Sequence, residues 1–174
     1  MKITKKTIIA AVAATSLTIG AIPAYAATPA KTVKAPTAQQ QKDSKVVTYA
    51  KSLIGTPYKK DGTTKKGFDA SGYVQHVYAK FNVQVPRTIK DIYKPGKNVK
   101  KPQQGDLVFF DTKNKKPREA NFVGIYIGND EFIAVTVNKG VSTQSLKADY
   151  WKKAFLGAQK APTTPIKKAP VKKK

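Results

Sequence analysis

Apolar residues recur at helical spacing soon after the first forty residues of the chain. They follow Ser44 and share one helical face, which predicts an amphipathic helix. Asp43 or Ser44 suits the N-cap of this helix, and Gly55 suits its end. The apolar residues on the shared face are Val46, Val47, Ala50, Leu53 and Ile54.

A second helix is predicted directly after a glycine- and lysine-containing loop over residues 56–68. Asp69 is suited to cap this helix, while Phe68 and Tyr73 are spaced to close a hydrophobic staple around its first turn. Its apolar positions again lie on one face. They are Ala70, Tyr73, Val74, Val77, Tyr78 and Phe81. A third, short helix is expected from Thr88 until the Pro-Gly pair that follows Lys94.

Beyond Pro102 the pattern changes to short apolar runs, which predict β-strands. Gly128-Asn129-Asp130 separates two of them as a hairpin turn would. Tyr150-Trp151 is expected to anchor the segment before the last strand. Helices followed by an antiparallel sheet make an α+β fold, with the helices packed on a small sheet. The predicted strands cover residues 107–110, 122–127, 132–137, 141–145 and 154–158.

The two ends of the chain differ from this central region. Residues 1–26 have a basic start, an apolar run and a final Ala-Tyr-Ala, as a secretory signal peptide does, and this ending disfavours a retained membrane anchor. Residues 27–43 are predicted to be a flexible linker and residues 161–174 a disordered Lys/Pro-rich tail. The folded domain is therefore expected to span residues 44–160, with no transmembrane anchor after signal cleavage.

Charge and cysteine content narrow the function. Lys and Arg number 33 against 10 Asp and Glu, and the chain has no cysteine. Without the predicted signal peptide and its three lysines the net charge is about +20. This positive charge would attract the protein to polyanions, which outside a cell include anionic wall polymers, lipid headgroups and released nucleic acid. The alternative is that the lysines only keep the protein soluble. The lack of cysteine excludes disulfides, thiol catalysis and cysteine-based metal sites.

The predicted start of the second helix is where a nucleophile would be expected. The amino end of a helix is electropositive and lowers the pKa of a thiol placed there. The residue at this position is Ala70, whose methyl group has no chemistry.

Five motifs between Val46 and Ala158 resemble the NlpC-type cell-wall cysteine peptidases, papain-like enzymes that cut peptidoglycan stem peptides. They occur in the order typical of that family. The motifs are Gly55-Thr56-Pro57-Tyr58, Gly67-Phe68-Asp69-x-Ser71-Gly72, Val85-Pro86-Arg87-Thr88, Gly105-Asp106-Leu107-Val108-Phe109-Phe110 and Val123-Gly124-Ile125-Tyr126-Ile127-Gly128.

The resemblance implies a papain-like fold and a catalytic triad whose three positions are vacated here. The family has a cysteine after the aspartate of the second motif, a histidine before the Val-Gly-Ile-Tyr strand, and a third polar residue on the next strand. This sequence has Ala70, Phe122 and Ala134 there, so the thiolate, its base and the group orienting the base are all absent.

The resemblance also suggests that binding is retained. Tyr58, Asp69 and Ser71 correspond to family positions that hold the stem peptide and its free amine. Each also has a structural interpretation: Tyr58 as a core aromatic, Asp69 as a helix cap and Ser71 as a helix-terminus hydrogen-bond partner. Arg87 is interpreted as structural. Residues 58–62 depart from the family, which has an aromatic residue and two glycines there, so the shape of the groove differs.

No other residue supplies the missing chemistry. Ser71 projects about 100° away from position 70 on the helix, and His76 lies roughly 9 Å farther along its axis, so His76 is expected to be solvated. A glycosidase needs two carboxylates across a cleft, whereas Asp106 and Asp111 flank one strand and Asp130 belongs to a hairpin. No metal site and no cofactor are predicted.

Three hypotheses follow. The first is a secreted, wall-associated, inactive homologue that binds peptidoglycan stem peptides or anionic wall polymers and regulates wall hydrolases. The second is an active endopeptidase that uses another nucleophile, or whose natural cysteine has been replaced. The third is a general polyanion binder. Aromatic residues interleaved with lysines are too few to favour nucleic acid.

Overall fold

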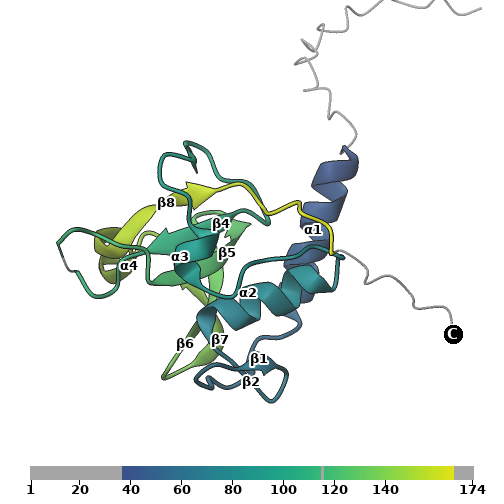
Figure 1. Ribbon diagram of the computed structural model, residues 1–174, viewed down its shortest axis with the longest axis horizontal. Helices are drawn as coiled ribbons and strands as arrows, with labels where there is room; N and C mark the ends of the chain where they lie inside the picture. The colour runs from purple at the N-terminus through teal and green to yellow at the C-terminus, as the bar shows by residue number, and fades with distance from the viewer. Residues whose placement is uncertain (1–36, 115, 167–174) are drawn as a thin grey trace, which may run out of the picture. The chain divides into compact units, whose positions relative to one another are not determined.

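The computed structural model describes residues 37–114 and 116–166, which lie in one unit formed by residues 35–174. Figure 1 shows helices packed against an antiparallel sheet. The helices are α1 (Ala38–Lys51), α2 (Ala70–Ala79), α3 (Ile89–Ile92) and α4 (Asp149–Ala154). The strands are β1 (Thr63–Thr64), β2 (Gly67–Phe68), β3 (Asn98–Val99), β4 (Leu107–Phe110), β5 (Phe122–Gly128), β6 (Glu131–Thr136), β7 (Gly140–Ser145) and β8 (Phe155–Gln159).

The main sheet has six strands in the order β3-β8-β4-β5-β6-β7, and every neighbouring pair is antiparallel. Strands β4 to β7 form a meander that follows the chain, and β8 returns to pair with β4 on its other side. A tight turn joins β5 to β6, and Gly128, Asn129 and Asp130 all have positive φ there. The predicted α+β fold and the predicted hairpin are therefore confirmed.

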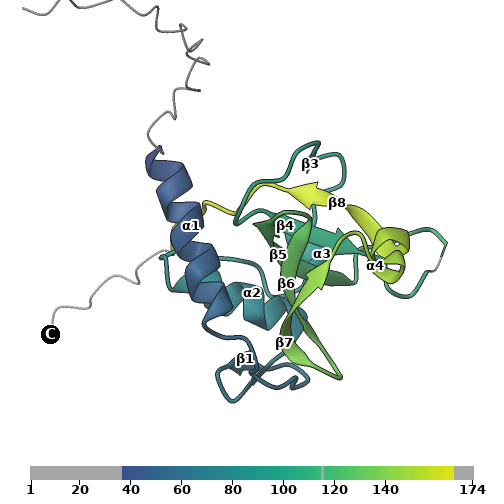
Figure 2. The ribbon, with the colours of Figure 1, turned by 180° about the vertical axis from the view of Figure 1, so that it is seen from behind.

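Both faces of this sheet are buried, which explains why its central strands read as continuous apolar runs. Helices α1 and α2 cover one face, where Ile125 and Ile133 belong to the same buried cluster as Val47 and Val77. Helix α4 covers the other face through Trp151 and Ala154. Figures 1 and 2 show α4 on the side of the sheet away from α1.

Helix α1 begins earlier than the sequence predicted. Thr37 is its N-cap, and Thr37 and Gln40 form a capping box in which each side chain accepts from the backbone N–H of the other. The prediction placed the cap at Asp43 or Ser44 because residues 38–42 have no apolar face. Local capping, and not burial, stabilises this exposed first turn. The predicted linker therefore overlaps the helix from Ala38 onward.

The first residues of the predicted disordered tail are ordered, so that prediction is wrong for residues 161–166. Gln84 donates its N–H to the carbonyl of Thr164 at 2.7 Å, and Ile166 donates to the carbonyl of Asn82 at 3.1 Å. An antiparallel bridge joins Val83 to Pro165. Backbone pairing, which needs no apolar pattern, fixes this segment beside the turn after α2.

The remaining terminal predictions lie outside the described residues. These are the signal peptide (1–26), the linker as far as residue 36 and the tail from residue 167. Across residues 37–114 and 116–166, no helix combines the length and the apolar character that crossing a bilayer requires.

Candidate functional site

The site is built on the first turn of α2, which starts at Ala70. Asp69 is the N-cap, and its Oδ1 accepts the N–H of Gly72 at 2.7 Å. Phe68 and Tyr73 are both fully buried, with ring centroids 5.8 Å apart. The predicted cap and staple are therefore confirmed. Ala70 is half-buried against the core on the α1 and α2 face of the sheet, so its methyl group lies where the helix amino end would polarise a nucleophile.

Arg87 holds the residues on either side of Ala70. Its Nη1 donates to Asp69 Oδ1 at 3.1 Å and to Ser71 Oγ at 2.7 Å, and its Nη2 donates to Asp69 Oδ2 at 2.5 Å. The hydrogen bond to Asp69 raises the pKa of the Arg87 guanidinium. Two of the three predicted ligand residues, Asp69 and Ser71, are therefore already engaged by one cation. This agrees with the structural interpretation of Arg87.

A short loop packs against the same helical turn and carries Tyr58. A parallel bridge pairs Tyr58 with Phe68, and the carbonyl of Gly62 accepts the N–H of Asp69 at 3.0 Å. A side chain at Gly72 would collide with that carbonyl, so glycine is required for this close approach. The Tyr58 side chain is 38% exposed. Tyr58 is thus not a core aromatic, and it stands beside the start of α2.

The other two positions of interest lie on the sheet. Phe122 opens β5, and Ala134 lies in β6 with its side chain fully buried. The register between β5 and β6, continued from Ile125 and Ile133, places Phe122 and Ala134 on the face that α4 covers. Gly124 lies on the same face, because a Cβ atom built there would be 3.3 Å from the Cβ atom of Ala134. The structure therefore brings Phe122 and Ala134 onto one face, while Ala70 packs in the cluster on the opposite face.

Phe122 belongs to an aromatic cluster. Its ring centroid lies 5.0 Å from Trp151 and 6.0 Å from Phe110, and Trp151 in turn lies 5.2 Å from Phe132. The indole N–H of Trp151 donates to Gln144 at 3.1 Å, which fixes the ring. Phe122 is thus a packing residue here. Of the predicted Tyr150-Trp151 anchor, Trp151 is buried, whereas Tyr150 is exposed.

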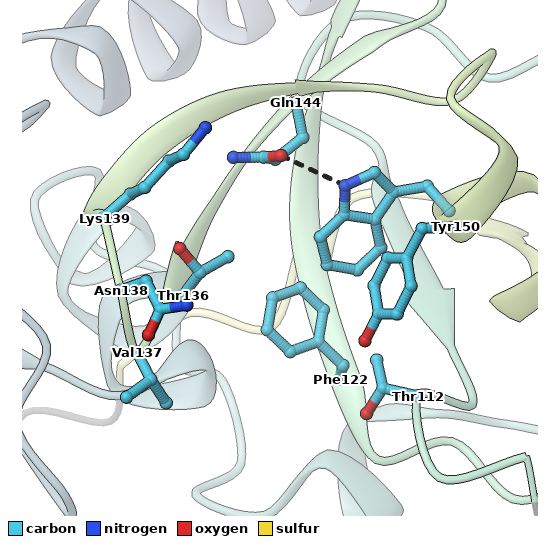
Figure 3. A pocket seen from close by; sticks show the side chains of 9 residues that line it. Thr112, Phe122, Thr136, Val137, Asn138, Lys139, Gln144 and Tyr150 are labelled. Carbon is cyan, nitrogen blue, oxygen red and sulfur yellow. Dashed lines mark hydrogen bonds between the residues drawn. The ribbon is translucent and has the colours of Figure 1, made fainter.

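A cavity of about 430 Å³ opens beside Phe122 (Figure 3). Its lining combines aromatic and polar side chains and includes neither Ala70 nor Ala134. The lining residues are Thr112, Phe122, Thr136, Val137, Asn138, Lys139, Gln144, Tyr150 and Trp151. The sequence showed no periodic signal for this cavity, because its walls come from segments up to 39 positions apart, at Thr112 and Trp151.

His76 was predicted to be solvated, but it is half-buried and packs against other rings. Its ring stands 4.9 Å from that of Phe68 and 6.1 Å from that of Tyr49, and its Nε2 is hydrogen-bonded to the Tyr49 hydroxyl at 3.1 Å. His76 therefore joins α1 to α2. In the described part of the chain, no group of three or more His, Cys, Asp or Glu side chains is placed to hold a metal ion.

The start of α2 brings together polar and charged side chains. The Asp69 carboxylate and the Arg87 guanidinium are paired next to Ala70, Tyr58 is bridged to Phe68, two positions before Ala70, and the chain has no thiol. Ser71 Oγ is buried and accepts from Arg87 and donates to Asp69 at 3.3 Å. It has no imidazole beside it to act as a base.

Comparison with family models matches residues 55–160 to the NlpC/P60 family. Among curated proteins, the probable peptidoglycan endopeptidase LytE of Bacillus subtilis is 44% identical over 118 residues, which cover 67% of this chain and 34% of LytE. The murein DD-endopeptidase MepS/murein LD-carboxypeptidase of Escherichia coli K12 is 36% identical over 61% of this chain and 56% of its own length. The chain thus spans about a third to a half of these relatives.

Solved structures resemble the same domain. A NlpC/P60 family protein from Bacillus cereus superposes with a TM-score of 0.63 at 26% identity, over 70% of this chain and 40% of that protein. The NlpC/p60 domain of the peptidoglycan hydrolase SagA superposes with a TM-score of 0.54 at 25% identity, over 62% of this chain and 92% of that domain.

Proposed function

Since the chain belongs to the NlpC/P60 family, we propose that it is a non-catalytic member that binds peptidoglycan stem peptides without cutting them. The observation that carries the proposal is the first turn of α2. It retains the Asp69 cap, the Arg87 clamp and the adjacent Tyr58, but it presents a methyl group at Ala70.

Two further features support loss of catalysis over an active endopeptidase. Phe122 is a packed aromatic ring with no ionisable group, and Ala134 is fully buried. Replacement of a single catalytic cysteine would explain Ala70 alone. It would not explain an apolar side chain at all three positions of the triad.

The recognition proposed for the groove uses the charges beside Ala70. The carboxylate of Asp69 attracts the free amine of a stem peptide, and the exposed ring of Tyr58 offers an apolar surface with a hydroxyl. Arg87 keeps Asp69 in place through two parallel hydrogen bonds, so this carboxylate is preorganised. An inactive protein bound in this way would shield stem peptides from active wall hydrolases.

The proposed location is the cell wall, after export. The signal-like sequence of residues 1–26 and the large positive charge support this location. Because exposed lysines also attract anionic polymers, wall binding has a charge component that salt screens and a groove component that salt affects less.

Sedimentation with purified sacculi, stripped of anionic polymers, tests the proposal. The protein is expected to co-sediment at low salt and to remain partly bound at 0.5 M salt, where the Debye length falls to roughly 4 Å. Tyr58→Ala is expected to lose the salt-resistant fraction, and Ile54→Ala, which trims another exposed apolar side chain, is the matched control. Absence of retention at low salt would remove the proposal. Complete loss at moderate salt would replace groove binding with general polyanion binding.

A further inference from the structure

The cavity beside Phe122 is lined by no residue of α2 and has its own chemistry. It lies over the face of β5 and β6 that α4 covers, and its volume of about 430 Å³ is within the range of small-ligand sites. Figure 3 shows Asn138 and Lys139 on one side of the cavity, Tyr150 on the other, and the ring of Phe122 between them.

Aromatic rings form one part of the lining. Tyr150 is 59% exposed, and its ring meets Trp151 edge-on at 4.8 Å. The rings of Phe122 and Trp151 are tilted by only 32° and are held in place by packing and by the Gln144 hydrogen bond. The cavity therefore offers rigid aromatic surface, which binds flat apolar groups with little loss of conformational entropy.

Apart from Val137, the remaining lining residues are polar, and two of them retain hydrogen-bonding capacity. Thr136 Oγ1 is buried and has no hydrogen-bond partner among the described residues. Gln144 accepts from Trp151 and donates to Ser142, which leaves its amide one donor and one acceptor. A buried hydroxyl without a partner is uncommon, and a ligand hydroxyl or carbonyl in the cavity would satisfy it.

This combination selects the chemical class of the ligand. A cation is disfavoured because none of the nine lining residues is acidic and Lys139 contributes a positive charge. An extended peptide would pair along a strand edge, and Gln144 does belong to the edge strand β7. The rest of the lining comes from β5, β6, α4 and the loops after β4 and β6, so backbone pairing along that edge would engage only part of the cavity. A pyranose ring fits better, since its C–H faces stack on aromatic rings while its hydroxyl and acetamido groups bond to the polar rim.

We infer that the cavity lined by Phe122, Tyr150 and Trp151 is a saccharide subsite that binds an N-acetylated amino-sugar unit. The inference rests on the proposed function only in taking the sugar from the glycan strand of the same wall polymer. With one site for stem peptide and one for glycan, the domain would recognise the two parts of the polymer at separate places.

Trp151 provides a direct probe because it is the single tryptophan of the chain and lines the cavity. The full chain is titrated with a soluble tetramer of β-1,4-linked N-acetylglucosamine while tryptophan fluorescence is recorded. A saturable change is expected. Tyr150→Ala, which removes an exposed ring, is expected to raise the sugar concentration at the titration midpoint about tenfold. This increase corresponds to the loss of one stacking contact.

A second variant tests the unpartnered hydroxyl. Thr136→Val keeps the shape of the side chain and removes a group that makes no hydrogen bond in the protein, so folding should be preserved. Sugar binding is expected to weaken roughly three- to tenfold, as for one lost hydrogen bond. Tyr58→Ala is the control and is expected to bind the sugar as the unmodified protein does.

The outcomes separate this inference from the proposed function. No saturable change up to millimolar tetrasaccharide, or unchanged affinity in both Tyr150→Ala and Thr136→Val, would overturn the saccharide subsite. A stem peptide that displaces the sugar would also overturn it, because the cavity would then be a peptide site. Loss of sacculus binding in Tyr58→Ala with intact sugar binding would support two separate sites.

Discussion

Arg87 binds both carboxylate oxygens of Asp69, the residue that caps α2, across 18 positions of sequence. The same guanidinium reaches Ser71, so one side chain fixes the residues before and after Ala70. The clamp orders the start of α2 without help from position 70. The start of α2 is therefore held in place by side chains other than that of residue 70.

Arg87→Ala is expected to lower the free energy of unfolding by about 1–2 kcal/mol, because it removes charge-assisted hydrogen bonds from a cap that is only partly shielded from water. Arg87→Lys should recover little of the loss, since an ammonium group cannot make the paired bonds. Urea unfolding measures both variants. Full stability of the alanine variant would show that the clamp is not structural.

Ala70→Cys is expected to introduce a reactive thiol whose pKa lies below the usual 8.5, because the amino end of α2 stabilises a thiolate. Ala79→Cys is the matched control, as it stands at the opposite end of the same helix. The rate of alkylation by iodoacetamide is measured from pH 5 to 10. Equal pKa values at the two positions would mean that the start of α2 is not electropositive.

Ala134→His is expected to destabilise the domain by about 1–3 kcal/mol, because an imidazole must enter a space that is fully enclosed beneath the aromatic cluster. Thr143→His, at an exposed position on neighbouring β7, should cost little. Thermal unfolding compares the two. If Ala134→His is as stable as Thr143→His, restoring the third position of the triad meets no steric barrier.

Burial raises the pKa of the Asp43 carboxyl above its ordinary value of 3.8, and the nearby Asp106 adds to the shift. A raised pKa in the folded state means that the ionised carboxylate opposes folding. This penalty is fully present above the folded-state pKa and disappears below 3.8. Asp43→Asn is therefore expected to be slightly more stable than the unmodified protein at pH 7. The difference should vanish as the pH falls to 3, as measured by urea unfolding across that range, and a constant difference would contradict the assignment.

The sequence predicted the elements whose signals are local. Asp69 was identified as a cap from residue type and spacing alone, and the third helix was expected to start at Thr88; both residues serve as N-caps. The five predicted strands match β4 to β8 to within about one residue, and the clearest signals came from β4, β5 and β6, which read as apolar runs because both faces are buried. The two-residue strands β1, β2 and β3 were not predicted. The resemblance to NlpC-type peptidases, which rested on five short motifs, is confirmed by the family match over residues 55–160.

The sequence could not predict features that depend on contacts between distant segments. The clamp by Arg87 joins residues 18 positions apart, and the packing of His76 needs Tyr49 from α1. The ordered segment at Thr164 is held by backbone hydrogen bonds, which leave no pattern in side-chain type. The cavity at Phe122 could not be predicted either, because its walls come together only when β5, β6 and α4 are assembled.

The most direct test of the central proposal measures binding and cleavage in one sample. Purified sacculi are incubated with the unmodified protein, sedimented, and examined for bound protein, while mass spectrometry quantifies muropeptides and new free amino groups in the supernatant. The account predicts bound protein and no product above a protein-free control. New amino groups released at a rate that follows the protein concentration would contradict it.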